Sequence, residues 1–277
     1  MHVARESSRR GSERTALVTG ASSGIGYELA RLFARDGFSL ILVARNRDAL
    51  DRIAEGLGAA HGVSSRIIAI DLTEPGAAER IYRAMKVENM HVDVLVNNAG
   101  YGAHGRFSRI DLSTEINMIQ LNVSVLTALT KLFLPQMLGR KYGRILNVAS
   151  TAAFQPGPLM AVYYASKAYV LSFSEALYEE LRGTGVTVTA LCPGPTKTNF
   201  QERASLAGSR MSAGGPLGMM DAETVARSGY RALMRGRPIA VPGMTNKLLV
   251  QMERLTPRWV VRRTVRAMQA SRSPTGI

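Results

Sequence analysis

The sequence lacks the features of a disulfide-bonded or membrane-spanning protein. Cysteine occurs once, at Cys192, among 277 residues. A single thiol cannot form an intramolecular disulfide, and this scarcity indicates a reducing compartment. No run reaches about eighteen consecutive apolar residues, so no spanning helix is expected. Residues 1–14 have no apolar core and do not resemble a secretory signal. We therefore expect a cytoplasmic protein.

Acidic residues are few compared with basic ones, and the excess lies mainly at the termini. The net charge is +14. Residues 1–14 form a polar basic arm that we expect to be disordered, and residues 235–277 carry eight arginines and one lysine against one glutamate. Such basicity suits nucleic acid. However, no nucleic-acid motif is present, and the C-terminal cations alternate with apolar residues rather than with stacking aromatics, so no nucleic-acid partner is expected.

Short apolar runs alternate with helical patterns throughout residues 15–243, which indicates βαβ units and a parallel sheet. The runs are apolar at every position, as is typical of a sheet covered on both faces. We predict an α/β fold with a Rossmann-type, doubly wound parallel sheet of about seven strands in a single domain. The expected strands are 15–20, 38–45, 65–72, 92–100, 143–150 and 185–194, and the longest helices are about 113–137 and 161–182.

The segment "TGASSGIG", residues 19–26, joins the first strand to the first helix. Gly20 allows a tight turn, Gly24 lets a phosphate approach the backbone, and Gly26 permits close packing of helix on strand. A strand before the segment and a helix after it are the context that a dinucleotide-binding turn requires. A plain glycine-rich turn is the alternative. The other residues expected to contact the cofactor here are Ser22, Ser23 and Ile25.

The spacing TGxxxGxG resembles that of the short-chain dehydrogenase/reductase family, and the likeness extends over about residues 14–243. Further motifs of the family follow in the expected order: Asp71 and Leu72, "NNAG" at 97–100, Asn122, Ser150, Tyr163, Lys167, and Pro193 with Gly194. Two stretches, "NNAGYGAHGRF" and "CPGPTKTNF", resemble the bacterial ketoacyl and steroid-type reductases.

Two adjacent tyrosines precede Lys167, and either could approach it, because helical residues three or four apart share a face. The family pattern YxxxK favours Tyr163 as the catalytic residue and leaves Tyr164 to pack elsewhere. By resemblance, Lys167 lowers the pKa of Tyr163 and holds the nicotinamide ribose. Ser150 binds the substrate oxygen, and Asn122 holds a water that connects Lys167 to solvent.

The end of the second strand bears on the choice of cofactor. NAD-dependent enzymes carry an acidic residue there, whereas an arginine accommodates the 2′-phosphate of NADP. This sequence has Ala44 followed by Arg45, with Arg47 nearby, so we predict NADP(H). Other expected cofactor contacts are Asp71 and Leu72 at the adenine, Asn98, Ala99 and Gly100 at its ribose, and Pro193, Gly194, Thr196 and Thr198 beside the nicotinamide.

The prediction is therefore an NADP-dependent oxidoreductase that interconverts a carbonyl and a secondary alcohol, with no metal. An NADP-binding regulatory or scaffold protein without turnover is the alternative. Apolar residues at 154–160 and about 199–220, with Tyr101 and Phe107, are the expected substrate walls, and they favour a fatty, steroidal or aromatic ketone. The family's habit implies a homodimer or homotetramer formed through the two long helices.

Residues 244–277 form a basic extension unlike the short tail usual in the family. Leu248, Met252, Leu255 and Trp259 follow a helical spacing, which Pro257 interrupts. One interpretation, slightly favoured, is that these four side chains cover the substrate cleft or a second subunit. The other is an amphipathic helix that rests on a membrane surface as a peripheral contact.

Overall fold

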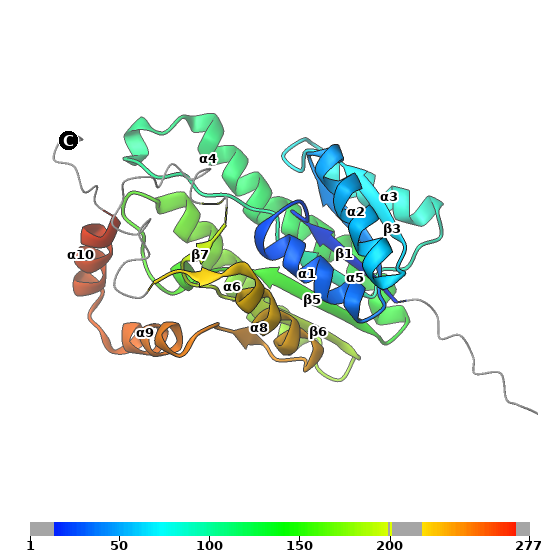
Figure 1. The fold of residues 1–277 in the computed structure, drawn as a ribbon. Coiled ribbons are helices and arrows are strands. Elements are labelled where there is room, and N and C mark those ends of the chain that lie inside the picture. The colour runs from blue at the N-terminus through cyan, green and yellow to red at the C-terminus, as the bar shows by residue number, and fades with distance from the viewer. Residues whose placement is uncertain (1–13, 199, 201–217, 270–277) are drawn as a thin grey trace, which may run out of the picture.

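The computed structural model describes residues 14–198, 200 and 218–269. Its main sheet has seven parallel strands in the order β3-β2-β1-β4-β5-β6-β9 (Figure 1). The strands are β1 Thr15–Thr19, β2 Ser39–Ala44, β3 Ser65–Ala69, β4 Val94–Asn97, β5 Gly143–Val148, β6 Val186–Leu191 and β9 Ile239–Ala240. The predicted doubly wound fold is confirmed. The chain order reverses between β1 and β4, where a ligand crevice forms in such sheets.

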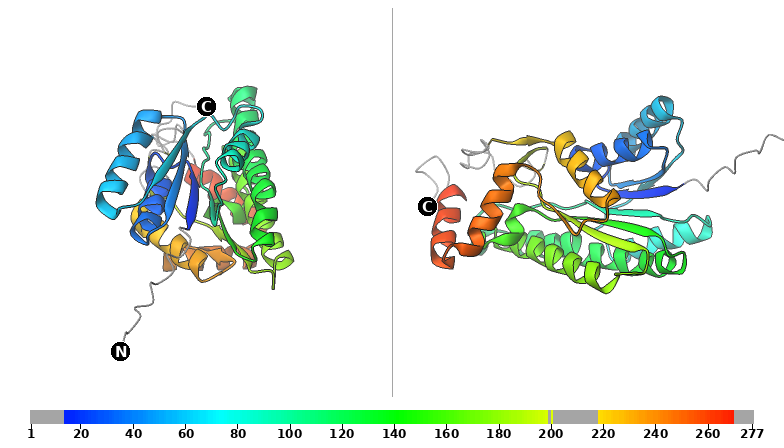
Figure 2. Two further views of the ribbon diagram at one scale, coloured as in Figure 1. Left: turned by 90° about the vertical axis from the view of Figure 1, so that its right-hand side faces the viewer. Right: turned by 90° about the horizontal axis from the view of Figure 1, so that it is seen from below.

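Helices cover both faces of this sheet (Figure 2). In β1, Ala16 and Val18 point into the core beneath one helix layer, while Leu17 points into the core beneath the other. All three are buried, which explains why the strand shows no alternation of apolar and polar residues. The first layer contains α1 Gly24–Arg35, α2 Arg47–His61 and α8 Ala222–Met234, and the second contains α3 Ala77–Val87, α5 Leu126–Gly139 and α6 Ala161–Glu180.

The first predicted long helix is continuous but changes its winding. It runs as α4 Leu112–Ile119, a π-helical segment η2 Gln120–Val125, and α5. By length and composition alone, Leu112–Gly139 would qualify as a membrane span, with 39% of its apolar window buried. Phe133 and Met137 on this helix are buried against the sheet, so packing of a sheet-covering helix accounts for much of its apolar character.

Two helices follow the last strand and lie together at one end of the molecule (Figures 1 and 2). They are α9 Met244–Leu255 and α10 Arg258–Gln269. The break falls at Pro257, as predicted. Thr256 before it is extended, with ψ 131°, because the proline ring disfavours helical geometry in the preceding residue.

Helix α10 packs against the N-terminal end of α6. Val261 and Val265 pack with Met160 and Tyr164. At the end of the helix, Gln269 Nε2 donates a hydrogen bond to the hydroxyl of Tyr164 over 2.8 Å. These contacts connect the C-terminal extension to the residue next to Tyr163.

The apolar stripe predicted on the extension does not cover the chain's own cleft. Leu248, Met252, Leu255 and Trp259 are between 52% and 90% exposed. The buried positions are instead Asn246 and Val250 on α9, and Val261, Val265 and Gln269 on the side of α10 away from Trp259. The expectation that the stripe covers the chain's own cleft was therefore wrong, because α9 turns Asn246 and Val250, rather than its most apolar side, toward the domain. Packing of the stripe on a second subunit stays a prediction. Residues 1–13 of the predicted arm lie outside the described residues.

Four smaller elements complete the described fold. They are the short parallel pair β7 Thr196–Lys197 and β8 Met220–Asp221, and the 3₁₀ turns η1 Phe107–Arg109 and η3 Thr151–Phe154.

Candidate active site

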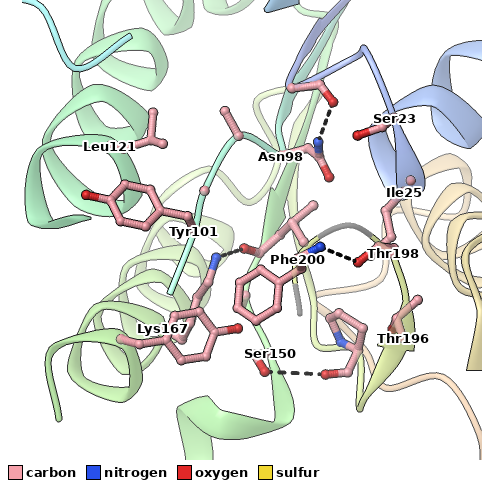
Figure 3. A pocket seen from close by; sticks show the side chains of 18 of the residues that line it. Ser23, Ile25, Asn98, Tyr101, Leu121, Ser150, Lys167, Thr196, Thr198 and Phe200 are labelled. Atoms are coloured by element: carbon pink, nitrogen blue, oxygen red, sulfur yellow. Dashed lines mark hydrogen bonds between the residues drawn. The ribbon is translucent and has the colours of Figure 1, made fainter. Parts of the chain in front are cut away.

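A cavity of about 730 Å³ opens at the carboxyl ends of β1, β4, β5 and β6. Ser23 and Ile25 lie at one end, and Ser150 and Lys167 at the other (Figure 3). It therefore occupies the crevice that the strand order predicts. All predicted site residues line it except Gly26 and Asn122: Gly20, Ser22, Ser23, Gly24, Ile25, Arg45, Asp71, Leu72, Asn98, Ala99, Gly100, Ser150, Tyr163, Lys167, Pro193, Gly194, Thr196 and Thr198.

The glycine turn leaves a cradle that larger side chains would fill. Gly24 begins α1 with φ +57°, and a Cβ there would lie 3.0 Å from Thr198. The side chain of Ser23, the N-cap residue, makes no capping hydrogen bond to the helix. An uncapped helix N-terminus that faces a cavity suits an anionic group such as a pyrophosphate. The residues present therefore fit a dinucleotide.

Gly26 lies behind the cradle rather than in it. A Cβ at this position would lie 2.3 Å from the carbonyl oxygen of Gly20. The turn is also held by Asn98, whose Nδ2 donates to the carbonyl oxygens of Thr19 (2.9 Å) and Gly20 (3.2 Å). Asn98 was expected to contact the adenine ribose. In this structure Asn98 lines the cavity, and its amide nitrogen also supports the glycine turn.

Arg45, the residue predicted to favour NADP(H), lines the cavity beside Asp71. Ala44 ends β2, and the side chain of Arg45 is 70% exposed, with its Nη1 3.7 Å from Asp71 Oδ2. A hydrogen bond from the backbone of Thr73 to Asp71 lowers the pKa of that carboxyl, with a smaller contribution from Arg45. Because its ion pair is long and solvated, Arg45 remains available to bind a phosphate. Arg47 points away, toward Asp51 at 3.8 Å.

Tyr163 and Lys167 meet at the other end, on one face of α6. Lys167 Nζ lies 5.9 Å from the centre of the Tyr163 ring and donates a hydrogen bond to the carbonyl oxygen of Val148 over 2.8 Å. Burial lowers the pKa of Lys167 to about 8. Burial also raises the pKa of Tyr163 to about 12, against a lowering effect of hydrogen bonding to Ser150.

This direction differs from the expectation that Lys167 lowers the pKa of Tyr163. In the protein chain alone, loss of water around the phenol outweighs the hydrogen bond to Ser150, because burial disfavours the phenolate. The Lys167 ammonium is itself disfavoured by burial. The expected lowering of the Tyr163 pKa therefore does not arise from these side chains by themselves.

Ser150 and Asn122 are held by specific partners. Ser150 Oγ, which follows β5, accepts a hydrogen bond from the backbone of Ala152 over 3.1 Å. Asn122 is buried in the π-helical segment, and its Nδ2 donates to the carbonyl oxygen of Tyr101 and to Ser166 Oγ, each over 3.0 Å. Single π-turns are frequent at functional sites. Here the π-turn carries the amide that supports the strand-end loop beside Lys167.

The segment after β6 closes the side of the cavity opposite α6. Thr196 Oγ1 donates a hydrogen bond to the carbonyl oxygen of Gly194 over 2.9 Å. Thr198 Oγ1 accepts one from the backbone of Phe200 over 3.3 Å. The Phe200 ring centre lies 5.3 Å from that of Tyr163, so an apolar ring lies directly beside the tyrosine.

The expected substrate walls are partly present. Tyr101, Gln155, Met160 and Phe200 line the cavity, whereas Phe107 is exposed outside it. Met219 and Met220 are not lining residues, and Met220 lies in β8. Leu206, Met211 and Leu217 lie outside the described residues. The lining residues that sequence reasoning missed include Leu121 and Ala152. Leu121 directly precedes Asn122, and the backbone N–H of Ala152 donates to Ser150 Oγ.

Tyr164 packs as predicted. It is buried, its ring centre lies 5.9 Å from that of Tyr163, and its hydroxyl accepts the hydrogen bond from Gln269. A further hydrogen bond joins His104 Nε2 to the backbone oxygen of Gln269 over 2.9 Å. No sequence motif pointed to Gln269, because its partners lie more than a hundred residues away.

Comparison with known proteins places this geometry in a family. The family model for short chain dehydrogenases matches residues 14–207. A short-chain dehydrogenase from Sphingobium yanoikuyae, solved in complex with NADPH, has 31% identity and a TM-score of 0.77, and the match covers 87% of this chain and 94% of that one. The chain belongs to the short-chain dehydrogenase/reductase family and is an oxidoreductase of that class.

Two further proteins carry more specific descriptions. The bulky-bulky ketone specific alcohol dehydrogenase from Comamonas testosteroni has 27% identity and a TM-score of 0.74, over 87% of this chain and 92% of that one. The very-long-chain 3-oxoacyl-CoA reductase of Anas platyrhynchos is 37% identical over 184 residues, which cover 64% of this chain and 58% of that protein.

Proposed function

We propose that this protein is an NADP(H)-dependent oxidoreductase that interconverts a carbonyl and a secondary alcohol on a large apolar substrate. The proposal rests on one observation: residues suited to bind a dinucleotide and residues suited to transfer a proton line the same cavity. An uncapped helix N-terminus and an arginine lie toward one end, and Tyr163, Ser150 and Lys167 lie at the other. A protein that only bound the dinucleotide would need the first set but not the second.

The proposed chemistry assigns one task to each side chain. A nicotinamide held in the cavity would supply the hydride that reduces the carbonyl carbon. Tyr163 gives its hydroxyl proton to the carbonyl oxygen, and the hydroxyl of Ser150 donates a hydrogen bond to the same oxygen. Lys167 holds the nicotinamide ribose and, when charged, favours the phenolate that Tyr163 becomes. Asn122 keeps the loop after β4 in position and holds the water that returns a proton toward Lys167.

The choice of NADP(H) rests on Arg45. No acid stands at the end of β2, and the Arg45 guanidinium is exposed at the rim of the cavity beside Asp71. A planar guanidinium can bind a phosphate through two parallel hydrogen bonds. The NADPH complex of the Sphingobium yanoikuyae relative supports the same choice.

The substrate class rests on the walls around Tyr163. Met160, Phe200 and Tyr164 make this end of the cavity apolar, and α10 packs behind it through Val261 and Val265. Such walls favour a fatty, steroidal or aromatic ketone over a small polar one. The ketone and oxoacyl substrates in the descriptions of two relatives agree with this class.

The decisive experiment measures NADPH consumption by the full chain against a panel of carbonyl compounds. We expect turnover of bulky apolar ketones and little turnover of small polar ones. Tight NADPH binding without turnover of any carbonyl would instead support the regulatory or scaffold alternative.

A paired variant tests the cofactor. Arg45→Ala should raise the KM for NADPH about 10- to 150-fold and leave the KM for NADH nearly unchanged, because a charge-assisted contact contributes roughly 1.5–3 kcal/mol. Arg47→Ala is the matched control and should change little, since its guanidinium is turned toward Asp51. Equal use of both cofactors by the wild-type protein would contradict the assignment.

A further inference from the structure

The outer side of the two C-terminal helices combines exposed apolar and cationic residues. On α9, Met244, Leu248, Met252 and Leu255 recur at helical spacing and are all exposed. Trp259 at the start of α10, four residues after Leu255, is exposed as well. We call these five residues the C-terminal apolar face. Large exposed apolar groups that gather on neighbouring elements mark an interaction surface.

Basic residues are exposed on the same two helices. Among the described side chains they are Lys247, Arg258, Arg262, Arg263 and Arg266. Glu253 is the only acidic residue between positions 244 and 269, and it is half-buried. The guanidinium of Arg263 lies 5.4 Å from the centre of the Trp259 ring, so cation and aromatic ring are next to each other. The partner that complements such a surface is both apolar and anionic.

We propose that the C-terminal apolar face docks the protein on the surface of an anionic lipid bilayer. A bilayer offers acyl chains to Leu255 and Trp259 and anionic headgroups to the arginines. Helix α9 has twelve residues, and at 1.5 Å per residue it spans about 18 Å, much less than a bilayer core of about 30 Å. The helix therefore lies in the interface and does not cross it.

A second copy of the chain fits this face less well. In a two-fold contact each residue meets the same patch on the partner, so the arginines of both copies would be brought together. No acidic patch on the two helices would offset that repulsion, since Glu253 is the single acid there. Exposed apolar residues for subunit contact are also present elsewhere, including Ile116 on α4 and Tyr169 on α6, the helices predicted to form the shared face.

The buried side of α10 connects the C-terminal apolar face to the cavity. Val261 and Val265 pack against Met160 and Tyr164, which line the apolar end. A bilayer on the C-terminal apolar face therefore lies one helix away from that end. The docking itself does not depend on the proposed reaction, and binding alone can test it.

Trp259 makes the test specific, because it is the only tryptophan in the chain. Its fluorescence is recorded for the full-length protein with vesicles of phosphatidylglycerol and phosphatidylcholine, and with vesicles of phosphatidylcholine alone. We expect a blue shift and protection from acrylamide quenching with the anionic vesicles only. Sedimentation with the same vesicles gives the apparent affinity.

Two variants, each with a matched control, separate the apolar from the electrostatic contribution to vesicle binding. Leu255→Asp should weaken binding to anionic vesicles by about tenfold or more, and Arg262→Glu by about fivefold or more. Val87→Asp, at an apolar residue that is 86% exposed on α3, and Arg83→Glu on the same helix should leave binding unchanged.

Three outcomes would overturn the proposal. One is the absence of a Trp259 shift with anionic vesicles. Another is equal vesicle binding by the wild-type protein and Leu255→Asp. The third is a Trp259 shift that follows protein concentration without vesicles, together with a lower mass for Leu255→Asp by light scattering, which would assign the face to a second copy.

Discussion

The turn between β1 and α1 and the helix pair α9–α10 both lie beside the cavity, but they are held in very different ways. In the turn, backbone meets backbone: the Cα hydrogen of Gly26 is directed at the carbonyl of Gly20, with no room for a methyl group. Helix α10 is held by Val261, Val265 and the hydrogen bonds of Gln269. A side chain added at Gly26 would therefore meet backbone, whereas most contacts of α10 are made by side chains.

This contrast has a functional consequence. The cofactor is the same molecule in every turnover, so a rigid backbone cradle suits it, and preorganisation lowers the cost of binding. The apolar substrate proposed above would have to enter and leave, and we expect a helix held mainly by side-chain contacts to accommodate that movement. We interpret the two ends of the cavity as a constant part and an adaptable part.

The largest effect is expected where the two parts meet. Tyr163→Phe should lower kcat by about 10²- to 10⁴-fold, because it removes the proposed proton donor. NADPH affinity, measured by fluorescence titration, should stay nearly unchanged, since the phenol hydroxyl is remote from the phosphate turn. A kcat close to that of the wild-type protein would refute the assignment of Tyr163.

A single added methyl group should disturb the turn between β1 and α1. Gly26→Ala places a Cβ 2.3 Å from the carbonyl oxygen of Gly20, so the backbone must move. We expect a loss of about 1–3 kcal/mol in the free energy of unfolding and weaker NADPH binding. Gly56→Ala is the matched control, because its Cβ would meet nothing within 4 Å inside helix α2. It should stabilise the protein by about 0.5–1 kcal/mol, and equal effects of the two variants would argue against a strained turn.

The buried lysine predicts a pH dependence of stability in the absence of cofactor. Burial lowers the pKa of Lys167 to about 8 in the folded chain, from 10.5 for a lysine in water. Between these values the unfolded chain binds more protons, so folding becomes more favourable as pH rises. Relative to Lys167→Met, the wild-type protein should gain about 2 kcal/mol between about pH 7 and about pH 9.5.

Urea unfolding of both proteins at the two pH values measures this gain. Tyr163, whose raised pKa works in the opposite direction, affects stability only as pH rises above about 10. A difference between wild type and variant that does not change with pH would show that Lys167 is not desolvated in the folded chain.

The adaptable part should respond least. Tyr164→Phe removes the hydroxyl that accepts from Gln269 Nε2 and should cost about 1–3 kcal/mol of local stability, because a buried donor loses its partner. Amide exchange in residues 258–269 should speed up, while kcat stays within a few-fold of wild type. Gln269→Leu should behave in the same way. A loss of kcat as large as that of Tyr163→Phe would mean that the two tyrosines act together.

Much of the fold was predictable because its determinants are local. A continuous apolar run such as 40–43 indicates a strand covered on both faces, and a glycine at 20 and at 24 marks a turn with positive φ. The family motifs also predicted many of the residues that line the cavity. Parallel strands end at the same edge of the sheet, so the residues that follow them lie close together. The break at Pro257 came from the restricted geometry of proline and of the residue before it.

Three features were not predictable from local pattern. The stripe of Leu248 and Leu255 is apolar at helical spacing, and only the docked helices reveal that it faces outward. The π-turn that carries Asn122 depends on packing along the whole helix. The pKa of Tyr163 depends on how much water is removed around the phenol, which residue order does not specify.

The amino-acid sequence by itself thus determined the parallel sheet, the glycine turn and the placement of Tyr163 one helical turn from Lys167, because each depends on periodicity or on the backbone freedom of one residue. Tertiary structure decided which side of α9 and α10 is buried, which partner Tyr164 finds, and how far burial shifts the pKa of Lys167 to about 8. These properties arise from residues far apart in the chain, where free energy depends on which surfaces meet and on how much water they exclude.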